Sequence, residues 1–180
     1  MPSKRTLVKQ VAVPAQSAVV SAFESVNLAD AFSIQLPSDA CANPDVLARF
    51  IFSVQPYWIA ALTNVRDAIV AGFGLKTAKH LATLSSDVTT RRVGIFKVYG
   101  TSDTEIVLGE DDKHLDFRVS ILCTSGSPPD IGNHLTLSTV VHCHNLLGRT
   151  YLSVIAPFHR QVVKASLRRA ANVGWPKASA

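Results

Sequence analysis

Residues 113–124 read KHLDFRVSILCT, and this stretch decides the fold that the sequence predicts. Apolar and polar side chains alternate along it, which is the pattern of a β-strand with one face in a core. The polar face carries three ionisable side chains in succession. The apolar set is Leu115, Phe117, Val119, Ile121 and Cys123, and the ionisable set is His114, Asp116 and Arg118.

A period of two also marks the stretches around this strand. Residues 94–99 and 105–110 alternate on either side of GTSD (100–103), which predicts a hairpin. Residues 134–144 alternate after a loop rich in Pro, Gly and Ser at 124–133. Further upstream, we expect a short turn at Leu28–Ala31 and a first strand at Phe32–Leu36. The sequence therefore predicts a run of antiparallel strands.

Two shorter helices are expected after the first strand. Asn43, Pro44 and Asp45 supply a capping side chain, a proline at the first helical position and an early carboxylate, so a helix should span Pro44–Val54. A second helix should begin at Pro56. Its apolar stripe consists of Trp58, Leu62, Val65 and Ile69.

The last expected element is a long amphipathic helix over Leu147–Ala171. Pro157 lies inside the pattern, which predicts a kink or a local break. The expected inward stripe is Tyr151, Ile155, Phe158 and Val162, and the expected opposite face carries Arg149, Arg160, Lys164 and Arg168.

This order of elements predicts an α+β domain with one antiparallel sheet and helices on one face. If the sheet curves around the last helix, a cavity between the two is expected. We divide the chain into an extended leader at 1–17, a single domain at 18–171 and a C-terminal tail at 172–180.

Composition limits the class of protein. The chain has 180 residues, is 47% hydrophobic and contains no uninterrupted apolar run of about 18 residues, so we expect no membrane association. The net charge is +5, and residues 149–180 contain no acidic residue. We interpret this basic end as a solvated helix face, since no nucleic-acid motif accompanies it. A loose resemblance of the first residues to a signal sequence leaves secretion as the alternative to a cytoplasmic protein.

The three cysteines, Cys41, Cys123 and Cys143, show no CxxC spacing. We expect buried free thiols, which favour a reducing cytoplasm.

The two strands with ionisable faces are expected to pair across the loop at 124–133. Like faces must meet, so paired residue numbers should sum to 256 or 258. Either register gathers one polar cluster, which consists of His114, Asp116, Arg118, His142 and His144.

Three interpretations of this cluster stay open. It is a partly solvated face held by ion pairs, or it binds an anionic or carbonyl-bearing ligand through Arg118. In the third, His114, His142 and His144 hold a metal ion with Asp116 behind them. We commit to neither a metal nor any other cofactor.

Tyr151 and His159 lie on or beside the inward stripe of the last helix. They either complete core packing or present polar tips to a cavity beneath that helix. No nucleophile elbow, paired-carboxylate cleft or Cys/His nucleophile signature is visible in the sequence.

Four stretches resemble the bacterial family called Domain of Unknown Function 2867. They are LADAFSIQLP, IVLGEDDKHLDFRVSI, VVHCHNLLGRTYLSVIAPFHRQVV and LRRA, and the resemblance covers most of residues 26–170. The HLDFRVS and HNxLGRxYL patterns are its most specific parts. The family is similar to the START/polyketide-cyclase superfamily, which implies a helix-grip fold, in which a curved antiparallel sheet wraps a long C-terminal helix. Some members are fused behind NAD(P)-binding domains, but this chain shows no strand followed by GxGxxG.

We therefore expect a START-like domain that binds a small apolar or amphipathic ligand between the sheet and the last helix. The candidate ligand-binding residues are His114, Asp116, Arg118, His142, His144, Tyr151 and His159. One alternative is an enzyme with Asp116 or a histidine as acid/base beside Arg118. Another is a non-catalytic accessory module for an NAD(P)-dependent oxidoreductase, and a homodimer is one candidate assembly.

Overall fold

The computed structural model describes residues 7–54, 56, 91–126 and 132–178. In this part of the chain a seven-stranded antiparallel sheet has the order β1-β2-β7-β6-β5-β4-β3. Its strands are β1 (Lys9–Val11), β2 (Leu28–Gln35), β3 (Arg92–Val93), β4 (Phe96–Thr101), β5 (Glu105–Asp111), β6 (Leu115–Thr124) and β7 (His134–Cys143). The helices are η1 (Ala18–Ser21), α1 (Pro44–Ser53) and α4 (Leu146–Val173).

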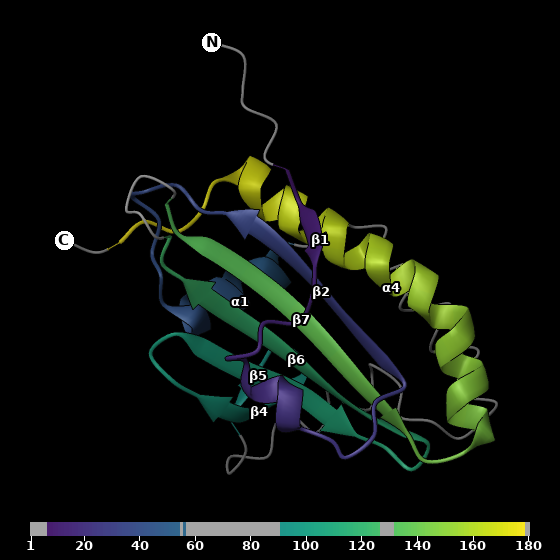
Figure 1. Ribbon diagram of the computed structural model, residues 1–180. Helices are drawn as coiled ribbons and strands as arrows, with labels where there is room; N and C mark the ends of the chain where they lie inside the picture. Colours follow the sequence, from purple (N-terminus) through teal and green to yellow (C-terminus); the bar gives the residue numbers. More distant parts are fainter. Residues whose placement is uncertain (1–6, 55, 57–90, 127–131, 179–180) are drawn as a thin grey trace.

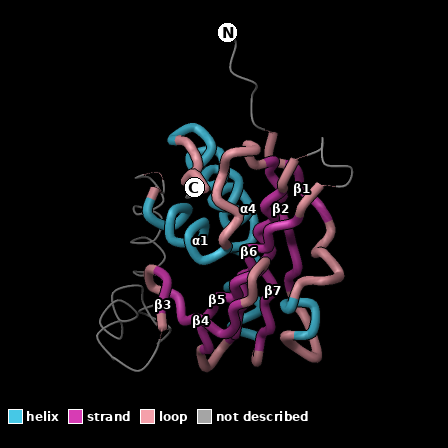
Figure 2. Tube along the Cα trace, turned by 90° about the vertical axis from the view of Figure 1, so that its left-hand side faces the viewer, coloured by secondary structure: helices cyan, strands magenta, loops and turns pink. Residues whose placement is uncertain are grey.

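The curved sheet separates two layers (Figures 1 and 2). The long helix α4 and the shorter α1 cover one face, which we call the inner face. The segment 13–25, which contains η1 and which we call the N-terminal segment, crosses the opposite, outer face. The predicted α+β class is confirmed, with a helix-grip-like arrangement of a curved antiparallel sheet and a long C-terminal helix.

The pairing of β6 with β7 confirms the 258 register. Asp116 lies opposite His142, and Arg118 lies opposite Val140. The odd-numbered residues of β6 face the inner side, as the alternation predicts. The hydrophobic core on that side includes the fully buried side chains Phe32, Ile34, Leu47, Ile51, Ile106, Leu108, Ile121, Leu135 and Leu167.

The predicted turn at Leu28–Ala31 is wrong, because these residues form the first half of β2. Strand β2 pairs with the central strand β7 along its whole length, from Leu28 opposite Val141 to Gln35 opposite His134. Pairing with a long neighbouring strand outweighs a weak local preference.

Helix α1 begins as predicted. The Asn43 side-chain oxygen accepts hydrogen bonds from the backbone N–H groups of Asp45 at 3.0 Å and Val46 at 3.2 Å. The second predicted helix, from Pro56 with its stripe at 58–69, lies outside the described residues except for Pro56 itself.

The inward face of α4 differs from the predicted stripe. Phe158 is 53% exposed. The size of the side chains misled the prediction, since small residues let this helix approach the sheet closely. Its buried residues are Gly148, Val163, Ser166, Leu167 and Ala170.

Helix α4 runs through Pro157 without the expected break. Pro157 removes one helical N–H donor, which would otherwise bond the carbonyl of residue 153. Both Ser153 and Pro157 are exposed. The exposed side of a helix tolerates this loss because water can bond the carbonyl.

The C-terminal residues that the structure describes pack against the domain. Trp175 is buried, and its ring centroid lies 6.0 Å from that of Phe50 on α1. The backbone of Pro176 accepts a hydrogen bond from Cys41 N–H at 2.7 Å. In the described part of the chain, no helix is both long enough and apolar enough to cross a lipid bilayer.

Candidate functional site

The outer face gathers most of the predicted polar cluster. Asp116 Oδ1 lies 3.1 Å from His144 Nε2. The rings of His142 and His144 meet at a centroid distance of 5.0 Å. His114 turns its Nδ1 to the Asn145 side-chain amide, 2.9 Å away, at the start of α4. Four of the five predicted residues thus lie on one face, and His114 contacts the helix cap.

Arg118 is engaged by residues of the neighbouring strands. Its Nη1 lies 2.8 Å from Asp111 Oδ1, and its guanidinium carbon lies 3.5 Å from the ring centroid of Tyr99. Phe23 from the N-terminal segment approaches the same guanidinium at 5.2 Å. Arg118 therefore joins strand β4, strand β5 and the N-terminal segment by charge and stacking.

The electrostatics of this group follow from its hydrogen bonds. The Tyr99 hydroxyl donates to Asp111 Oδ2 at 2.7 Å. Burial alone would raise the pKa of Asp111, but hydrogen bonds from Tyr99 and Arg118 and the Arg118 charge outweigh it and lower the pKa. Burial, and then the bond to Asp111, raise the pKa of Tyr99. The carboxylate is thus ionised and the phenol neutral at pH 7.

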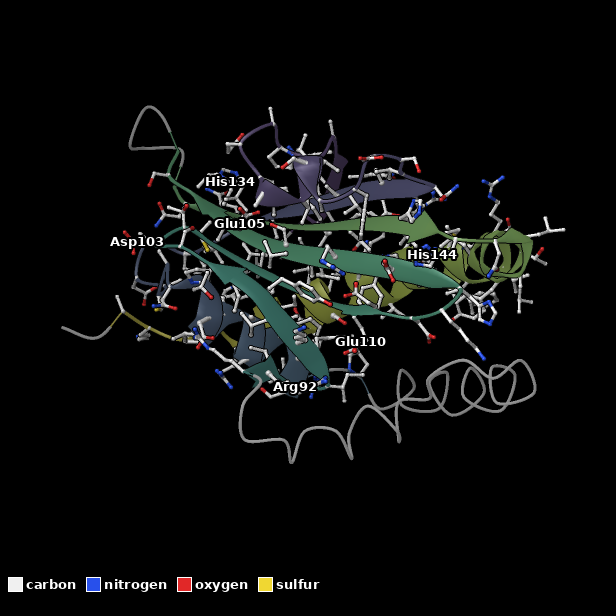
Figure 3. The ribbon with its side chains drawn as sticks, turned by 90° about the horizontal axis from the view of Figure 1, so that it is seen from below. Arg92, Asp103, Glu105, Glu110, His134 and His144 are labelled. Carbon is white, nitrogen blue, oxygen red and sulfur yellow. The ribbon has the colours of Figure 1, made fainter. Side chains whose placement is uncertain are left out.

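The N-terminal segment covers much of the outer face, which sequence reasoning did not predict. Val19 is fully buried against Val107 and Val140. Glu105, labelled in Figure 3, is buried on β5. Its carboxylate accepts hydrogen bonds from three groups. The donors are the Ser17 hydroxyl at 2.5 Å, the Ala18 backbone N–H at 3.0 Å and the Ser120 hydroxyl.

A second polar cluster lies on the inner face, between the sheet and α4. We call it the inner-face cluster, and it consists of Asp30, Thr139, His159 and Arg160. Asp30 on β2 lies directly opposite Thr139 on β7. Arg160 Nε on α4 lies 3.2 Å from Asp30 Oδ2, and His159 Nε2 lies 3.5 Å from Asp30 Oδ1. One strand pair and one helix therefore position all four side chains.

The inner-face cluster is deeply buried on the sheet side. Asp30 is 4% exposed and Thr139 is 3% exposed. Thr139 Oγ1 has no hydrogen-bond partner, and Asp30 Oδ1 and His159 Nε2 face each other at 3.5 Å without forming a hydrogen bond. Native proteins pair more than about 90% of such groups, and an unpaired one costs roughly 1–3 kcal/mol. A further polar group placed beside Asp30 Oδ1 and Thr139 Oγ1 would complete the hydrogen bonding of the cluster.

Half-buried apolar side chains adjoin this cluster on the inner face. Leu28 lies two positions before Asp30 on β2. Val141 on β7 pairs with Leu28 on one side and with Phe117 on the other. Leu28, Phe117 and Ile155 of α4 are each partly exposed. The buried charge therefore borders an apolar strip that the described residues leave partly open.

Of the two helical residues that the sequence singled out, His159 belongs to this cluster. Tyr151 is half-buried on α4, eight residues before it. Sequence reasoning missed Asp30, Thr139 and Arg160. The available signal was a carboxylate in LADAFSIQLP, in the middle of an apolar strand.

Two other arrangements are weaker candidates for a site. Among the residues that the structure describes, no three His, Cys, Asp or Glu side chains are placed to hold a metal ion. A hollow of about 520 Å³ lies at the start of α1, beside Asp45, Arg91 and Asp103. It is polar and open, and Arg91 and Arg49 already bond Asp45, so it offers little to a ligand.

The comparisons with known proteins give one match. A family model described as Protein of unknown function (DUF2867) matches residues 22–166. No curated protein and no solved structure matches the chain.

Proposed function

The chain belongs to the DUF2867 family, and from its inner-face cluster we propose that it binds a small amphipathic molecule between the sheet and α4. The observation that carries the proposal is a set of three buried polar atoms that form no hydrogen bond, at Asp30, Thr139 and His159, of which Asp30 and His159 face each other at 3.5 Å. The ligand's polar end meets these atoms. Its apolar body lies along the strip at Leu28, Phe117 and Ile155.

A purely structural role for Asp30 accounts poorly for this geometry. A buried ion pair stabilises a fold only when its remaining oxygen lone pairs are also bonded. Arg160 engages one oxygen of Asp30, while the other has no hydrogen bond. A buried polar group that is only partly satisfied calls for an explanation such as a functional role or a bound water or ion.

The fold supports a place for the chain in the START/polyketide-cyclase superfamily, as the sequence resemblance implies. The supporting features are the curved antiparallel sheet and the long C-terminal helix. In this arrangement the ligand lies between sheet and helix. The free thiols Cys41, Cys123 and Cys143 agree with a cytoplasmic location.

An enzyme that uses Asp116 and His144 on the outer face is the second candidate. Their 3.1 Å contact could hold and move a proton. Arg118, the cation of that scheme, already pairs with Asp111 and stacks on Tyr99, which favours the inner site. Service as an accessory module for an oxidoreductase and assembly as a homodimer stay predictions.

Native mass spectrometry of the freshly purified full chain tests the proposal. We expect a population carrying a non-covalently bound small molecule. Asp30→Asn should lower the bound fraction about tenfold, because a hydrogen bond to a charged group contributes roughly 1.5–3 kcal/mol. Its unfolding free energy should fall by about 1–3 kcal/mol, because the buried amide bonds Arg160 less strongly than the carboxylate does, while half-exposed Arg160 can turn to water.

Asp116→Asn is the matched control, because it alters a carboxylate–histidine pair on the opposite face of the same sheet. It should retain the bound molecule. Loss of the adduct in Asp116→Asn alone would move the site to the outer face, and a wild-type protein without any adduct would contradict binding altogether.

A further inference from the structure

We propose that the polar end of the ligand is an uncharged hydroxyl group, an alcohol or a phenol, that bonds Asp30 Oδ1 and Thr139 Oγ1. This inference rests on the proposed function and names the ligand class. It starts from the chemistry of the unpartnered atoms, which lie on two adjacent strands at directly opposed positions. Side chains at such positions are separated by about 5 Å between Cβ atoms, so one small group can reach both.

The charges around Asp30 limit the charge that a ligand can carry. Asp30 is buried with only 2% of its side chain exposed, and Arg160 Nε lies 3.2 Å from it. The formal charges of Asp30 and Arg160 cancel, so this ion pair carries no net charge. A bound ammonium or carboxylate would add an uncompensated charge where water is largely excluded, which is costly. A carboxylate would in addition face the Asp30 oxygen that has no hydrogen bond.

Asp30 and Thr139 differ in the hydrogen bonds that they can form. An ionised carboxylate oxygen only accepts hydrogen bonds, whereas a threonine hydroxyl both donates and accepts. A ligand hydroxyl can donate to Asp30 Oδ1 and accept from the Thr139 hydroxyl. An ether or ketone oxygen cannot donate, and would leave Asp30 Oδ1 as it is now. The cluster thus discriminates a hydroxyl from an oxygen that lacks a proton.

A ligand can approach the cluster from the side of α4. His159 has 25% of its side chain exposed and Arg160 has 42%, so the α4 side of the cluster reaches the surface. Leu28, Phe117 and Ile155 are partly exposed beside it. The hydroxyl enters first toward the sheet, and the apolar body stays along this strip.

Four probes on one scaffold test the inference by isothermal titration calorimetry at pH 7.5. They are 2-(2-naphthyl)ethanol, its methyl ether, 2-(2-naphthyl)ethylamine and 2-naphthylacetic acid. The alcohol should bind at least about tenfold more tightly than the ether and than either charged probe. In Asp30→Ala the advantage of the alcohol over the ether should fall below about threefold, whereas Asp116→Ala should preserve it.

The outcomes separate this inference from the proposed function. Equal binding of all four probes, or tightest binding of the amine or the acid, would overturn the hydroxyl assignment and leave the inner site standing. If an adduct is present in the native protein but none of the probes competes with it, the hydroxyl assignment is likewise overturned. Absence of both adduct and probe binding would overturn the site as well.

Discussion

Replacement of Gly148 by alanine is expected to lower the free energy of unfolding by about 3 kcal/mol. A Cβ on Gly148 would lie 2.2 Å from the backbone oxygen of His114 and 3.0 Å from its carbonyl carbon. Neither atom can move without shifting the entry to β6, which pairs with both β5 and β7. The first turn of α4 would have to withdraw from the sheet.

Helix propensity and the steric contact predict opposite signs for the change in the free energy of unfolding. Alanine is a better helix former than glycine by about 1 kcal/mol, so helix propensity alone predicts that Gly148→Ala stabilises the protein. Urea unfolding of the two proteins decides between propensity and contact. Gly100→Ala is the control, because a Cβ there meets nothing within 4 Å, and its change should stay within about 1 kcal/mol. A Gly148→Ala protein as stable as wild type would contradict the close approach.

The second large effect is expected for Glu105→Ala, which should cost about 3 kcal/mol of unfolding free energy. The change leaves three donors without their common acceptor: the hydroxyls of Ser17 and Ser120 and the N–H of Ala18. It also opens a space beneath the N-terminal segment. The segment should then detach from the outer face.

Hydrogen exchange and limited proteolysis can both detect this detachment of the N-terminal segment. In Glu105→Ala the amides of Ala18 and Val19 should lose protection, and protease should cut within residues 13–25 before the domain unfolds. Asp103→Ala, an exposed change on the same β4–β5 turn, should alter neither readout. If the segment stayed protected in Glu105→Ala, then Glu105 would not be its anchor.

The antiparallel strands could be predicted because a single local rule governs them. In β6 and β7 alternate residues must enter one core, so the alternation specifies both the strands and the face that pairs. It limited the register to a sum of 256 or 258, and the structure has 258. The capped start of α1 was likewise local, since Asn43 bonds N–H groups only two and three residues away.

The parts that could not be predicted depend on contacts between distant segments. The N-terminal segment bonds Glu105, which is nearly ninety positions further along the chain. The inner face of α4 is chosen by the small residues that fit the sheet, Gly148 among them, and not by the largest apolar ones. Pairing with β7 decided that Leu28–Ala31 is strand.

In the candidate site, too, local pattern predicted some of the residues and contacts between distant segments determined the others. Alternation brought Asp116, Arg118, His142 and His144 to one face, as expected, but said nothing of the N-terminal segment that crosses it. The inner-face cluster joins Asp30 with His159 and Arg160, about 130 positions apart. Only the complete fold brings these residues together.

The most direct measurement is a crystal structure of the wild-type protein with its co-purified molecule bound. We expect electron density for that molecule between β2 and α4, with a polar atom within about 3.2 Å of Asp30 Oδ1 and an apolar part against Phe117. Density on the outer face beside His142 and His144 would contradict the account. So would an inner face in which the protein's own side chains bond Asp30 Oδ1 and leave no room for a ligand.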